Sequence, residues 1–160
     1  MALAPRQYQR ANLEHQLHHF YLACCRAIWK LLPQDASRRG IELAEQYLLG
    51  EVTGEELSQF NWNVEGAAFN IDYNVDPESI ERWCEEVRGI PETELGQLLH
   101  PADVKHEIEP RDLLLRAAYF VDYAMIYPSL SPKGPPPKRY SLFLSAVLLR
   151  QCVGNPFQSK

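Results

Sequence analysis

The side chains best suited to catalysis or metal binding in this sequence lie in its first predicted helix. Residues four apart share a helical face, so His15 and His19 could together ligate a divalent transition metal. A stable site needs further donors from elsewhere, for which the candidates are Glu45, His100 and His106. Helical-wheel arithmetic places both first-helix histidines on a polar edge. A solvated pair without a metal is therefore the alternative that the pattern favours, and we expect no cofactor.

Two adjacent cysteines follow in the same helix. A thiolate beside Arg26 would have a lowered pKa and could act as a nucleophile. Cys24 falls in the middle of the apolar stripe, which predicts a packing role. Cys25 lies on the flank near Trp29 and is the more plausible reactive thiol. We expect all four cysteines to be reduced, as in a cytoplasmic protein.

No complete catalytic motif accompanies these residues. The sequence contains no Gly-rich phosphate loop, paired-cysteine zinc spacing, nucleophile elbow or H-E-x-x-H motif. His100 and His106 flank a predicted loop and could act as acid or base, but nothing in their spacing requires it. The pattern therefore favours a protein without enzymatic activity.

Tyrosines give the sequence its candidate interaction surface. Tyr119, Tyr123 and Tyr127 recur every four residues and share one face of a predicted helix. Apolar rings with polar tips suit a protein interface, although the pattern favours the edge of a core somewhat more. The proline-rich segment 128–139 is a second candidate, because a polyproline stretch can occupy a recognition groove; a linker between two helices is the simpler interpretation.

Helices must position all these residues. Apolar side chains recur at three- and four-residue intervals throughout, which predicts an all-α single domain over residues 1–160, a bundle of about six helices. The first two helices form a hairpin, and the proline-rich linker 128–139 precedes the last helix. The predicted helices span 9–32, 35 or 37 to Gly50, Thr53 to about 74, 76–89, a short stretch within 91–100, Pro110 to Pro128, and 140–153.

The amino-acid composition narrows the class of protein further. A chain of 160 residues that is 46% hydrophobic and 23% charged has the balance of one folded globular domain. The net charge of -5 makes nucleic acid an unlikely partner, and the short basic groupings are only Arg38-Arg39 and Lys138-Arg139. No apolar stretch approaches the length of a membrane span or a secretory leader, which predicts a cytoplasmic protein.

Three segments resemble an uncharacterised family of helical bacterial proteins. They are the Ala23-Cys24-Cys25-Arg26-Ala27-Ile28-Trp29 stretch with its continuation to Tyr47, the Glu65-Gly66-Ala67-Ala68 segment, and the terminal Leu148-Leu149-Arg150…Gly154-Asn155-Pro156-Phe157. The family pattern has a cysteine where this sequence has Leu22. The resemblance implies helicity and an intact helical hairpin, and it implies no known activity.

Two hypotheses about function follow. The first is a non-enzymatic helical module that binds a protein partner, or forms a homo-oligomer, through the tyrosine face or the proline-rich segment. The alternative is a small metal-dependent helical-bundle enzyme that uses His15 and His19. The pathway is open in both.

Overall fold

The computed structural model describes residues 5–100, 108–130 and 137–153, with side chains from residue 12 onward. Every regular element in these ranges is helical, which confirms the all-α bundle predicted from the sequence. The α-helices are α1 (Pro5–Ala27), α2 (Asp35–Leu48), α3 (Gly54–Asp72), α4 (Pro77–Arg88), α5 (Glu92–Leu98), α6 (Pro110–Ala124) and α7 (Ala146–Val153). Two 3-10 helices, η1 (Trp29–Leu31) and η2 (Lys138–Phe143), complete the set. None of the described helices is long and apolar enough to cross a membrane.

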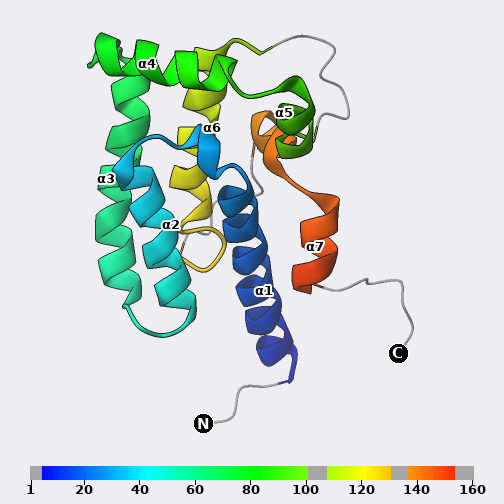
Figure 1. The fold of residues 1–160 in the computed structure, drawn as a ribbon. Coiled ribbons are helices and arrows are strands. Elements are labelled where there is room, and N and C mark those ends of the chain that lie inside the picture. The colour runs from blue at the N-terminus through cyan, green and yellow to red at the C-terminus, as the bar shows by residue number, and fades with distance from the viewer. Residues whose placement is uncertain (1–4, 101–107, 131–136, 154–160) are drawn as a thin grey trace.

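Helix α6 forms the centre of the bundle. It packs against α1, α2, α3 and α4, and η2 lies against it as well. Figure 1 shows α3, α2 and α1 side by side, with α4 across one end and α7 beside α1. The side chains of α6 explain its position, because both Leu113–Leu114 and Phe120–Val121 are buried, so that apolar residues cover more than one face.

Three helix boundaries lie where capping residues predict them, whereas the predicted helix 9–32 is divided into α1 and η1, and α6 ends at Ala124, before the predicted Pro128. The Thr53 hydroxyl accepts from the Glu56 amide at 3.1 Å, and the Glu56 carboxylate accepts from the Thr53 amide at 2.8 Å, a complete capping box at the start of α3. The Asp76 carboxylate and Pro77 begin α4 in the same way. Gly50 ends the α2 segment with a φ of 78°.

The C-terminal segment differs from the prediction of one helix over 140–153. The chain forms η2 first and begins α7 only at Ala146, because the Ser145 hydroxyl accepts from the Leu148 amide and starts a new helix there. The predicted linker 128–139 is also shorter, since Lys138 and Arg139 belong to η2. Residues 131–136 lie outside the described ranges.

Candidate functional site

His15 and His19 lie together on the exposed side of α1. Their rings meet edge to face with centroids 5.2 Å apart. His19 lines an open hollow of about 500 Å³ whose walls also include Arg26, Glu45 and Leu49. The predicted pair therefore shares a surface, and a carboxylate lies in the same hollow.

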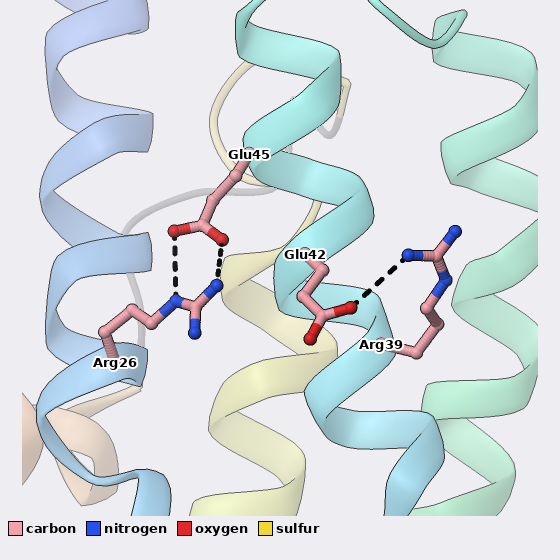
Figure 2. A network of polar contacts seen from close by, with 4 residues as sticks. All are labelled: Arg26, Arg39, Glu42 and Glu45. Atoms are coloured by element: carbon pink, nitrogen blue, oxygen red, sulfur yellow. Dashed lines mark hydrogen bonds and ion pairs between the residues drawn. The ribbon is translucent and has the colours of Figure 1, made fainter.

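That carboxylate is already engaged. Glu45 accepts two hydrogen bonds from Arg26, at 3.1 Å from Nε and 2.6 Å from an Nη atom, and Figure 2 shows the two side chains facing each other between α1 and α2. Arg39 pairs with Glu42 beside them at 3.3 Å. A metal ion would have to compete with a bidentate arginine for both Glu45 oxygens.

Among the described residues, the remaining donor that the sequence suggested, His100, does not complete a metal centre. The exposed residue His100 follows α5, and its backbone amide donates to the Leu142 carbonyl at 2.7 Å. His106 lies outside the described residues. Within the described part of the chain, no three histidine, cysteine or acidic side chains cluster as metal ligands. Metal binding by His15 and His19 therefore stays a prediction that rests on two ligands.

His18, between these two histidines, is fully buried and has a structural role. Its Nε2–H donates to the Met125 carbonyl at 3.0 Å, and its Nδ1 accepts from the Ser129 hydroxyl at 2.9 Å. The carbonyl can only accept, so Nε2 must carry the proton. Burial lowers the pKa of His18 to about 4, which keeps the ring neutral. The imidazole thus joins α1 to the turn after α6.

The two cysteines of α1 are both buried, so the prediction of Cys25 as a reactive thiol is wrong. Burial raises the pKa of Cys24 to about 11 and holds the pKa of Cys25 well above its usual range. The positive charge of Arg26 is directed to Glu45 instead of the thiol. Both sulfurs are protonated packing groups, because a thiolate would lose its hydration there.

The three predicted interaction tyrosines divide into two environments. Tyr123 and Tyr127 stack with ring centroids 4.8 Å apart, and Tyr127 meets Tyr21 edge to face at 5.2 Å, so this pair packs on the edge of the core. Tyr119 turns toward α3, where its hydroxyl donates to the Asp72 carboxylate at 2.8 Å. Its ring lies 6.2 Å from that of Phe69. Binding by these tyrosines stays a prediction.

Phe69 belongs to an aromatic surface that the sequence reasoning missed. Trp62, Gly66, Phe69 and Tyr73 recur every three or four residues along α3 and the residue that follows it, and we call these four residues the outer stripe. Trp62 is 76% exposed, Phe69 39% and Tyr73 74%. The opposite face of α3 holds the buried core residues Leu57, Val64, Ala67, Ala68 and Ile71. Helix α3 therefore carries two apolar faces, and the described part of the bundle covers only one of them.

A groove runs along one edge of the outer stripe. It has a volume of about 550 Å³ and lies between α3, the start of α2 and one residue of α4. Trp62 and Gly66 line it from the stripe, and Trp83 lines it from α4. No atom comes within 4 Å of the position that a Cβ of Gly66 would occupy, so the stripe is open at its middle.

The charged residues in the sequence segment that contains the outer stripe are all acidic. The sequence from residue 40 to residue 81 contains no lysine, arginine or histidine, while carboxylates recur through it. Glu55 precedes Trp62 by seven residues on the same face, and Glu65 follows it by three at the edge. Two arginines of α6 approach the far end of α3, where Arg111 donates to the Ile71 carbonyl and Arg116 pairs with Asp112. The stripe is therefore acidic over its first half.

Comparisons with known proteins add no relative to this description. No protein-family model, no curated protein and no solved structure matches the chain. The resemblance to a family of helical bacterial proteins stays a prediction. The fold and the surface of the described residues define the class of protein only as an all-α bundle with an exposed aromatic helix face.

Proposed function

We propose that this protein is a non-enzymatic helical module that binds another protein. The observation that carries the proposal is the outer stripe of α3, where Trp62 and Tyr73 expose about three quarters of their surface. Exposed aromatic side chains grouped on one helix face are typical of protein-binding surfaces, in which tryptophan and tyrosine supply much of the affinity. Scattered single exposed residues would carry no such argument.

The neighbourhood of the stripe supports the same function. Tyr119 extends the aromatic surface onto α6, because its ring contacts Phe69 and its hydroxyl is fixed by Asp72. Two packed helices therefore present the surface, and the Phe69 ring at its middle contacts the rings of Tyr73 and Tyr119. The groove beside Trp62 is concave and could receive a side chain of the partner.

The alternative of a metal-dependent enzyme finds less support on the described residues. His15 and His19 adjoin each other, but Arg26 holds the nearby Glu45 carboxylate. The buried cysteines and His18 are engaged in packing and hydrogen bonding. We therefore propose binding alone.

Site-specific photo-crosslinking in an extract of the source cells tests the proposal. A benzophenone amino acid replaces Trp62 or Tyr73 on the stripe, and in matched controls it replaces Glu92 or Glu109, which are exposed near the starts of α5 and α6. We expect discrete adducts of one protein partner from the two stripe positions and none from the controls. Equal labelling at all four positions, or no adduct from the stripe, would contradict the proposal.

A further inference from the structure

We infer that the outer stripe docks a basic amphipathic helix of another protein, an inference that rests on the proposed function. The partner segment would place apolar side chains on Trp62, Phe69 and Tyr73 and would direct lysine or arginine toward Glu55 and Glu65. Shape, charge and the exclusion of other occupants each support this class of partner.

The shape of the surface suits a helix. From Trp62 to Tyr73 the stripe covers eleven residue steps, or about 17 Å at 1.5 Å per residue, which matches about three turns of a partner helix. Its ridge of aromatic rings is interrupted at Gly66, and the groove of about 550 Å³ runs alongside. This is the arrangement in which an amphipathic helix lays its apolar face on a groove. A peptide that binds by adding a β-strand would need a free strand edge, and the described residues form no strand.

The charge of the surface selects the polar residues of the partner. Between residues 40 and 81 the sequence contains carboxylates and no cationic residue, and Glu55 and Glu65 lie two turns before and one turn after Trp62 on α3. Both carboxylates lie on the outer side of α3, away from its core residues. Lysine or arginine beside an apolar anchor would complement this potential, whereas an acidic helix would meet like charge.

The same charge argues against two other occupants. A second copy of the chain would bring the same acidic patch against that of the first, because a symmetric contact uses one patch on both molecules. An anionic membrane surface would repel the acidic stripe, since helices that lie on such membranes are rich in lysine and arginine. A basic helix of a different protein avoids both conflicts.

A displayed peptide library tests the inference. The probe is a set of 18-residue amphipathic helices with a fixed leucine and phenylalanine face and polar positions randomised among Lys, Arg, Glu, Asp, Gln and Ser. Selection uses the full chain, with counter-selection against the double variant W62S/Y73S, so only stripe-dependent peptides are kept. We expect Lys and Arg to be enriched at the polar positions, and binding of the enriched peptides to weaken as salt is raised.

A matched pair of charge variants sharpens the result. E55Q/E65Q removes the two carboxylates of the stripe, and E92Q/E109Q removes two exposed carboxylates at the starts of other helices. The enriched peptide should bind E55Q/E65Q about fivefold more weakly at low salt and E92Q/E109Q with little change. Equal effects of the two variants, or enrichment of acidic or uncharged residues, would overturn the basic-helix inference while leaving a protein-binding stripe in place.

Two further results would have different meanings. Sedimentation of the wild-type chain that shows a dimer, lost in W62S/Y73S, would assign the stripe to a second copy and overturn the inference. A selection that yields no peptide dependent on Trp62 or Tyr73 would count against both the inference and the proposed function.

Discussion

In α1 the side chains of His18, Cys24 and Cys25 point into the bundle, whereas in α3 unreactive aromatic side chains point out of it. His18, Cys24 and Cys25 are buried and serve hydrogen bonding and packing. Trp62 and Tyr73 lie on the far side of α3 from the core. The contrast teaches that residue type alone misdirects the search for a site here. Exposure separates these two sets of side chains, and the binding surface that we propose belongs to α3.

Both helices owe this arrangement to α6. The turn after α6 carries the Met125 carbonyl and the Ser129 hydroxyl that hold His18. On its other side, the Asp122 carbonyl and carboxylate accept from the Asn61 amide at 3.0 and 2.9 Å, which fixes the rotation of α3. That rotation turns Ile71 inward and Tyr73 outward.

The largest expected difference in stability is between variants of Ile71 and Tyr73. Ile71→Ala removes a fully buried side chain, and we expect the free energy of unfolding to fall by about 3 kcal/mol, through lost burial and the cavity left behind. Tyr73→Ala trims a side chain that is 74% exposed and should change that free energy by less than about 1 kcal/mol. Urea denaturation measures both. A similar loss in the two variants would remove the distinction between the faces.

The pH dependence of stability tests the buried role of His18 in α1. The pKa of this histidine falls from its ordinary value of 6.5 to about 4 on folding. Between these values the unfolded chain binds more protons, so lowering the pH favours unfolding, and the contribution is complete above about 6.5. We expect the wild type to lose about 3 kcal/mol more than His18→Gln between pH 7 and pH 4.

Denaturation at a series of pH values gives this difference directly, because glutamine does not titrate and can still donate a hydrogen bond to the Met125 carbonyl. Parallel curves for the wild type and His18→Gln would show that the imidazole is not held neutral. In that case the structural role assigned to His18 would be wrong, and His18 would be an accessible group like His15 and His19.

Substitutions of two glycines compare the inner and outer faces of α3 through smaller changes in stability. A Cβ at Gly40 of α2 would lie 2.6 Å from the Val64 side chain on the inner face of α3, so Gly40→Ala should cost about 1 to 3 kcal/mol. A Cβ at Gly66 meets no atom within 4 Å, and Gly66→Ala should raise stability by up to about 1 kcal/mol through helix propensity. Thermal or urea unfolding of the two variants should therefore shift in opposite directions. A loss at Gly66 would mean that the outer face is covered within the chain.

Local signals predicted most of the fold, because they act within a few residues. The capping box at Thr53 and Glu56, Pro77 at the start of α4 and Gly50 after α2 each fix a helix end through neighbouring backbone groups. The break before α7 escaped prediction, since the apolar spacing after Tyr140 also suits a continuous helix. Only the Ser145 cap divides the two segments there.

The candidate site was harder to predict, because its key contacts join distant parts of the chain. The roles of His18 and Cys25 depend on what α1 packs against, including Ser129, 111 residues beyond His18. The outer stripe had a readable signal, the spacing of Trp62, Phe69 and Tyr73, but a sequence with two apolar faces does not say which face the bundle covers. Packing of α3 on α2 and α6 decides it.

The most direct test of the central claim measures stability and binding in the same variant. W62S/Y73S changes two side chains that contribute little to the core, so the free energy of unfolding should stay within about 0.5 kcal/mol of the wild type. A basic amphipathic peptide enriched on the wild-type chain alone, without the counter-selection, should bind this variant at least about tenfold more weakly, as expected for aromatic anchors of an interface. Unchanged binding together with a loss of more than about 1 kcal/mol in stability would show that the outer face of α3 serves folding and not recognition.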